Sequence, residues 1–195
     1  MDAIRIIRDE HRSIEAVMHA LTHLARAAQD PAVRPGFEVL RAMIYYIAEY
    51  PERLHHPKED GQLFARLAAR APEAKPLLDE LSAEHASGAP MLRGLEHALL
   101  DFEQNWPRGA REFAAAVAAY ADFHCKHMRK EEEQVLPLAE RVLSAEDWRA
   151  IDEAFAGHHD PFAGVRGQDF ERLFAHIVAL APEPIGLGAP WKKAG

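Results

Sequence analysis

The sequence predicts an all-α protein, folded as an antiparallel four-helix bundle in up-down-up-down order. Hydrophobic residues make up 48% of the 195 residues, and strong helix formers are abundant while β-branched residues are few. Apolar residues recur at steps of three and four through four long stretches, which is the period of an α-helix. The connections between these stretches are short and marked by proline or glycine, so consecutive helices should run antiparallel.

The first two helices carry polar residues on their apolar faces. The first is expected over about residues 2–28, with His11 at a position where leucine would be usual. The second starts near residue 32, and its apolar face runs over 37–63. Pro51 and Pro57 lie inside this pattern, so a kink or short break is expected close to the polar residues of that helix.

The third and fourth helices repeat this departure from a plain apolar face. The third, over about 78–102, has His85 on its face, with Gly88 and Pro90 one turn further on, where a bend is expected. The fourth, over about 113–138, has three ionisable residues in the middle of its face: His124, His127 and Glu131.

Counting residues to each turn places six of these groups at one height in the bundle. Each count runs from a polar residue of one helix to the following turn, and from that turn to a polar residue of the next helix. The two counts are about 21 and 23 residues at the first turn, about 13 and 13 at the second, and about 21 and 21 at the third. Burying an unpaired charge is costly, and a bound metal would remove that cost. The six are His11, His55, Glu59, His85, His127 and Glu131.

Four imidazoles and two carboxylates can hold two first-row transition metals, with each carboxylate bridging. This donor set suits Fe, Mn or Zn, whereas a structural zinc site would usually contain cysteines. The alternative is a set of hydrogen-bonded core histidines with ordinary salt bridges, but six such groups at one height favour metal. His56 and His124 are candidates for an additional ligand, as are three tyrosines: Tyr45, Tyr46 and Tyr120.

Composition excludes several other classes of protein. The net charge of −8, without a basic cluster, argues against a nucleic-acid partner. The one cysteine, Cys125, cannot form an intramolecular disulfide and fits a reducing, cytoplasmic location. The charged start of the chain does not resemble a signal peptide, and no apolar run approaches membrane-spanning length, so no membrane partner is expected.

The chain changes character after residue 143, and we divide it into a bundle over 1–143 and a helical extension over 144–195. Ser144 is expected to cap a short helix that reaches about Phe155. A break over 157–161 precedes a further helix over about 169–181, and the tail that follows is rich in Pro and Gly and should be extended.

Over about residues 1–143 the chain resembles hemerythrin-like proteins of the HHE cation-binding family. The matching stretches are 9–14, 55–60, 63–64, 84–85 and 127–137. The resemblance implies that His11 and His55 bind one iron, that His85 and His127 bind the other, and that two carboxylates bridge them: Glu59 and Glu131.

The resemblance also carries a difference. Oxygen-carrying hemerythrins have a further histidine one turn after the ligand of the third helix, where this chain has Ala89. One metal is therefore expected to lack a nitrogen ligand, and reversible oxygen transport is not expected.

The function we expect is a non-haem di-iron protein that binds or senses O₂, NO or iron. The alternatives are a redox enzyme that consumes peroxide or NO, and a metal-free interaction bundle. The sequence does not identify a protein partner.

Overall fold

The computed structural model of the protein describes residues 2–156 and 167–193, and most of these are helical. The β-type pairings among the described residues are isolated bridges. The all-α class predicted from the sequence is therefore confirmed. The elements are α1 (Asp2–Ala27), α2 (Phe37–Glu49), η1 (Pro51–His55), α3 (His56–Lys58), η2 (Glu59–Phe64), α4 (Ala65–Arg70), η3 (Pro72–Ala74), α5 (Lys75–Asn105), α6 (Ala110–Lys130), η4 (Glu131–Val135), α7 (Leu136–Val142), α8 (Ala145–Ala156) and α9 (Gly167–Leu180).

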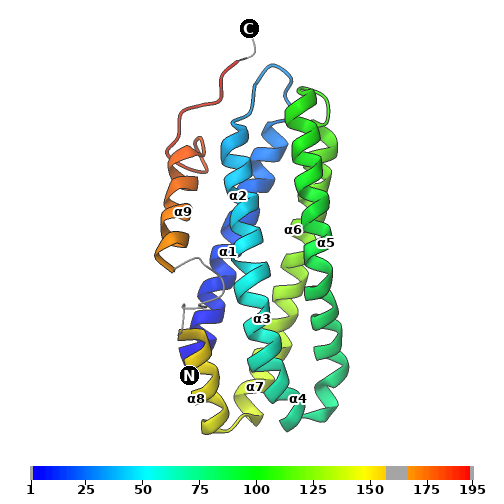
Figure 1. Ribbon diagram of the computed structural model, residues 1–195, viewed down its shortest axis with the longest axis vertical. Coiled ribbons are helices and arrows are strands. Elements are labelled where there is room, and N and C mark those ends of the chain that lie inside the picture. The colour runs from blue at the N-terminus through cyan, green and yellow to red at the C-terminus, as the bar shows by residue number, and fades with distance from the viewer. Residues whose placement is uncertain (1, 157–166, 194–195) are drawn as a thin grey trace.

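The long helical segments lie side by side along the long axis of the molecule (Figure 1). Helix α1 packs against α6 and α2, and α5 packs against α6 and α2. The segments from α2 to α4 follow one another as one long rod, and α6 continues in the same way through η4 into α7 (Figure 1). The result is a helical bundle whose inner faces come from distant parts of the sequence.

Three π-helical turns interrupt these rods, and all three contain or adjoin the polar residues singled out above. In η1, which opens at Pro51, the backbone N–H of His55 donates to the carbonyl of Tyr50, five residues earlier, at 3.1 Å. Glu59 opens η2 and Glu131 opens η4. Such turns are frequent at functional sites. The sequence predicted a kink or break near Pro51 and Pro57, but no residue near Glu131 predicted the π-helical turn that begins there. Helix α5 continues through Pro90 as one helix.

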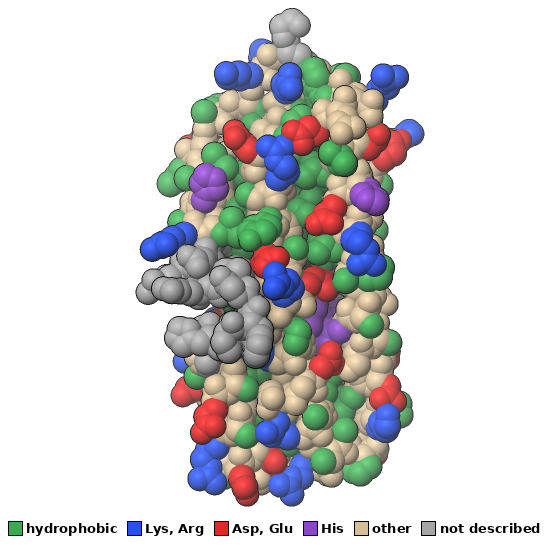
Figure 2. Space-filling model, in the orientation of Figure 1, with side chains coloured by type: hydrophobic (Ala, Val, Ile, Leu, Met, Phe, Trp, Pro, Cys, Tyr) green, Lys and Arg blue, Asp and Glu red, His purple; other side chains and the backbone are tan. Residues whose placement is uncertain are grey.

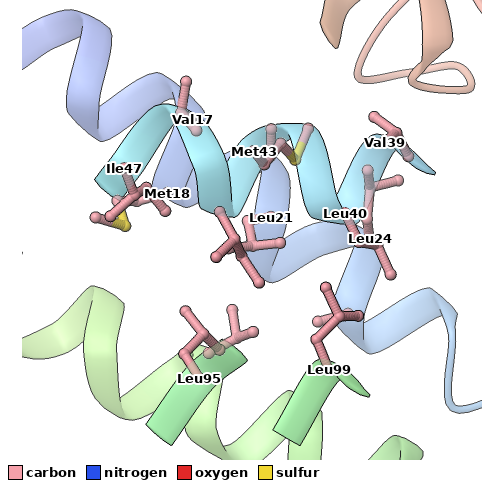
Figure 3. Close-up of a cluster of buried hydrophobic side chains, with 14 of the residues drawn as sticks. Val17, Met18, Leu21, Leu24, Val39, Leu40, Met43, Ile47, Leu95 and Leu99 are labelled. Carbon is pink, nitrogen blue, oxygen red and sulfur yellow. The ribbon is translucent and has the colours of Figure 1, made fainter. Parts of the chain in front are cut away.

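Two hydrophobic clusters fill the bundle, one on each side of the polar residues. The first joins α1, α2, α5 and α6, and its leucine and methionine side chains point toward one another (Figure 3). The second joins the start of α1 with η2, α4, α7 and α8. Along α1, Ile7 belongs to the second cluster and Ile14 to the first, with His11 between them. The polar residues thus form a layer across the bundle with apolar packing above and below.

The C-terminal helices pack on this bundle. Helix α8 contacts α1 and η2, and it is capped as predicted, because the hydroxyl of Ser144 accepts the backbone N–H of Asp147 at 3.2 Å. Helix α9 contacts α2. The predicted break at 157–161 lies outside the described residues. Near its end the tail is hydrogen-bonded to the connection between α1 and α2, where the backbone N–H of Arg34 donates to the carbonyl of Lys192 at 2.9 Å.

Among the described residues, we find no helix with both the length and the apolar character that crossing a membrane requires.

Candidate metal centre

Four histidines from four different segments meet as two pairs in the polar layer. His11 of α1 faces His55 of η1, with 3.0 Å between their Nε2 atoms. His85 of α5 faces His127 of α6, with 2.8 Å between their Nε2 atoms. All four side chains are buried. The pairs are the same two that the resemblance implied.

Glu59 and Glu131 lie between the two pairs. One oxygen of Glu131 lies 3.4 Å from His11 Nε2, and the other lies 3.2 Å from His127 Nε2. Glu59 approaches His55 Nε2 at 3.3 Å and His85 Nε2 at 3.6 Å. Both carboxylates are buried, and none of their four oxygens has a hydrogen-bond partner. Buried carboxylate oxygens normally have partners, so this arrangement leaves four strong acceptors unsatisfied.

The outward-facing nitrogen, Nδ1, of each of these histidines meets a second carboxylate. In every case the carboxylate comes from the neighbouring segment of the bundle, so the four contacts close a ring around the centre. They are His55 with Glu10 at 2.7 Å, His85 with Asp60 at 3.0 Å, His127 with Glu84 at 2.9 Å, and His11 with Glu132 at 2.9 Å.

Two lysines hold members of this ring in place. Lys58 donates to Glu10 at 3.0 Å, and Lys130 contacts Glu84 on the far side of the bundle. Burial raises the pKa of Glu10, but its contacts with His55 and Lys58 outweigh burial and lower it to about 2. Glu10 is therefore an anion at neutral pH and a permanent acceptor for the N–H of His55.

In the metal-free protein, a proton shared between the two Nε2 atoms would account for the short separation within each histidine pair. If both Nδ1 atoms donate to their carboxylates, two Nε2 atoms can stand at hydrogen-bond distance only when one carries a second proton. Burial lowers the pKa of His11, but the negative charges of the nearby Glu131 and Glu59 carboxylates raise it well above the usual value. Burial likewise opposes the charged form of His85, yet Asp60 and Glu131 raise its pKa to about 10.

The residues fit a pair of metal ions. The donor atoms of His11, His55, Glu59 and Glu131 lie within 4.8 Å of one another, and so do those of Glu59, His85, His127 and Glu131. Both groups share the same two carboxylates, which is the arrangement that bridging requires. Two cations would supply the missing partners of the four carboxylate oxygens and replace the protons held between the imidazoles. The ring of outer carboxylates fixes Nε2 as the free nitrogen of each histidine.

The other residues proposed as additional ligands differ in how close they lie to the centre. Tyr45 is 52% exposed and does not line the centre. His56 and His124 are buried, and their rings stack at 5.8 Å between centroids. Burial and the neighbouring histidines lower the pKa of both, that of His124 to about 3, so both are neutral at pH 7. The hydroxyl of Tyr120 donates to Glu52 at 2.8 Å.

Sequence reasoning missed the outer carboxylates and Glu52. A signal was present, because each outer carboxylate directly follows or precedes a residue of the inner set, as in Glu10-His11 and Glu131-Glu132. On the face shown in Figure 2, histidine is visible at mid-height in a recess between the helices, with acidic side chains around it.

Comparison with known proteins agrees with this geometry. The family model described as the hemerythrin HHE cation binding domain matches residues 2–139. A search of curated proteins found no match. The matched span contains all six inner residues and all four outer carboxylates. The chain belongs to the hemerythrin HHE cation-binding domain family.

Proposed function

We propose that the protein is a non-haem di-iron protein that binds or senses a small diatomic molecule, O₂ or NO, at the polar layer of the bundle. His11 and His55 would hold one iron, His85 and His127 the other, and Glu59 and Glu131 would bridge them. Mn or Zn could occupy the same donors. The observation that carries the proposal is the pair of buried carboxylates without hydrogen-bond partners, each placed between two histidine pairs.

The surrounding residues suit this role. When bound, two iron ions supply a redox centre and Lewis acidity toward small oxygen or nitrogen ligands. The outer carboxylates orient the imidazoles and accept their Nδ1 protons, so the rings can exchange the shared Nε2 proton for a metal without turning. The two hydrophobic clusters exclude bulk water from both sides of the layer.

We also propose how the chain is divided, how its helices run and where the protein is located. We propose that residues 1–143 form the metal-binding unit, that its four rods alternate in direction, and that 144–195 form an extension packed on it. The colours in Figure 1, which run from the N-terminus to the C-terminus, support this alternation of helix direction. We expect a cytoplasmic location and no nucleic-acid or membrane partner, on the grounds of charge and composition.

Anaerobic metal titration tests the centre. Protein loaded with Fe(II) should bind about two equivalents, as two bridged sites require. Adding O₂, NO or H₂O₂ to the loaded protein and following the optical spectrum then identifies the ligand to which the centre responds. A spectral change that stops once the centre is occupied would indicate binding or sensing, whereas steady consumption of peroxide would indicate the alternative, a redox enzyme.

A matched pair of variants makes the titration specific. Glu131→Gln removes one bridging carboxylate, whereas Glu133→Gln changes an exposed neighbour on the same turn. The first should lose tight binding of at least one equivalent, and the second should bind like the parent protein. A folded parent protein that binds no metal under these conditions would overturn the proposed function.

A further inference from the structure

His56 is a buried histidine beside the centre whose role the six-residue set does not explain. It directly follows His55 and is 5% exposed. One of its ring nitrogens lies within 4.8 Å of donor nitrogens of His85 and His127. Its ring stacks on that of His85, with 4.3 Å between centroids and 13° between planes. Its Nδ1 atom is buried and has no hydrogen-bond partner.

A carboxylate also faces the Nδ1 side of His56, although it lies beyond hydrogen-bond distance. The Nδ1 atom of each inner histidine faces a carboxylate, and Nδ1 of His56 faces Glu52, with 3.8 Å to Oε2. Tyr120 holds that carboxylate by donating to its other oxygen at 2.8 Å. Since Glu52 stands on the Nδ1 side, Nε2 is the nitrogen left for a metal.

The neighbouring helix leaves room for this carboxylate. Gly88, one turn after His85, is buried, and a Cβ atom at this position would collide with the carboxylate of Glu52. Ala89, where oxygen carriers place their further histidine, is exposed. Helix α5 thus presents a bare backbone to Glu52 and contributes no second ligand there.

His124 is the other buried histidine nearby, and its surroundings differ. Its Nε2 atom faces Glu52 Oε1 at 3.6 Å. Among the described residues, the groups able to hold a metal include His56 with His85 and His127, but none of them includes His124. Its Nε2 atom has no hydrogen-bond partner, so His124 supplies neither a ligand nor a hydrogen bond to Glu52.

We infer that His56 is a third histidine ligand of the metal held by His85 and His127, with Glu52 as its positioning carboxylate. This inference rests on the proposed two-metal centre. It supplies from α3 the nitrogen ligand that α5 lacks. It also makes the two metals unequal, with three histidines on one and two on the other, so that the more open position lies on the His11 and His55 side.

The test is anaerobic Fe(II) titration with Mössbauer spectra of ⁵⁷Fe-loaded protein. His56→Phe removes the nitrogens and keeps a ring to stack on His85, whereas His124→Phe makes the same change at a residue without the proposed role. Loss of a ligand should cost at least the roughly 10- to 100-fold seen for outer partners of ligands. We expect His56→Phe to weaken the binding of one of the two iron equivalents by that factor and to shift one of the two Mössbauer signals. His124→Phe should do neither.

Chemical rescue separates ligation from packing. His56→Gly leaves a hole of imidazole size, and added imidazole should restore the second equivalent and its iron signal, while the same addition to His124→Gly should change nothing. Gly88→Ala should weaken the same equivalent by displacing Glu52. Two equivalents bound by His56→Phe with the parent's affinity and spectrum would overturn the inference and leave the proposed function standing. A parent protein without iron would overturn both.

Discussion

Glu84 of α5 and His127 of α6 are joined across a helix interface by a contact of 2.9 Å between a carboxylate oxygen and Nδ1. The contact determines the tautomer of the ring and directs Nε2 toward the centre. Burial raises the pKa of Glu84, but hydrogen bonds with Lys130 and His127 lower it below the usual value, so the carboxylate is charged at neutral pH. The same arrangement occurs four times around the bundle, which makes the outer ring as testable as the inner ligands.

Replacing Glu84 by Gln should weaken metal binding by about 10- to 100-fold, because the amide removes the charge that orients His127 and raises its basicity. Glu80→Gln is the matched control, since Glu80 also contacts Lys130, at 2.6 Å, but touches no histidine of the centre. Competition with a chelator of known affinity measures both. Equal losses in the two variants would mean that the Lys130 contact, and not the histidine contact, is what matters.

Metal binding should release protons and tighten as pH rises. The pKa of His85 in the metal-free protein is raised to about 10 from an ordinary value of 6.5. A raised pKa in the folded state contributes stability that is present in full below pH 6.5 and is lost as pH rises through about 10. The metal-free protein should therefore lose stability over this window.

The metal-loaded protein should lack this loss, because its imidazoles bind metal instead of protons. Melting temperatures of both forms between pH 6.5 and 10 provide the comparison. Calorimetric titration in two buffers of different ionisation enthalpy gives the number of protons released. Metal binding without proton release would contradict the shared-proton description of the histidine pairs.

Removing the metal should lower the melting temperature. A metal that binds only the folded bundle stabilises it by about 2.7 kcal/mol when its free concentration is a hundred times the dissociation constant. Without metal, the oxygens of Glu59 and Glu131 are buried and have no hydrogen-bond partners. Thermal unfolding followed by circular dichroism, before and after treatment with a chelator, measures the difference. Identical curves for the two forms would argue against an internal centre.

The layer of inner residues could be predicted because helix geometry is regular. Residues at steps of three and four share a face, and equal counts to a turn bring His85 and His127 to one height. The outer ring could not be predicted in this way. Glu84 is rotated by about 100° from His85 on the helix, and whether it meets His127 depends on which helix lies on that side.

The π-helical turns lay beyond sequence reasoning for a different reason. Pro51 made a disturbance near His55 predictable, but nothing in the residues Glu131–Val135 excludes an ordinary helix. These turns depend on how the whole bundle packs around the polar layer. The role of Glu52 could not be predicted from the sequence either. Its carboxylate can be buried because Gly88, on another helix, leaves space for it.

The C-terminal extension should contribute as much to the core as the bundle helices do. Phe155 of α8 is 0% exposed and packs in the second hydrophobic cluster, and its ring lies 4.7 Å from the Nζ atom of Lys58. Phe155→Ala should lower the free energy of unfolding by about 3–5 kcal/mol, the usual cost of removing a buried aromatic ring. Leu187→Ala, at a position 84% exposed, is the control and should change it by less than about 0.5 kcal/mol. Because Phe155 is neither one of the six inner residues nor one of the outer carboxylates, iron stoichiometry should stay at about two per chain in both variants. Denaturant unfolding supplies the energies. If Phe155→Ala unfolded like the control, α8 would be an attachment to the bundle and not part of its core.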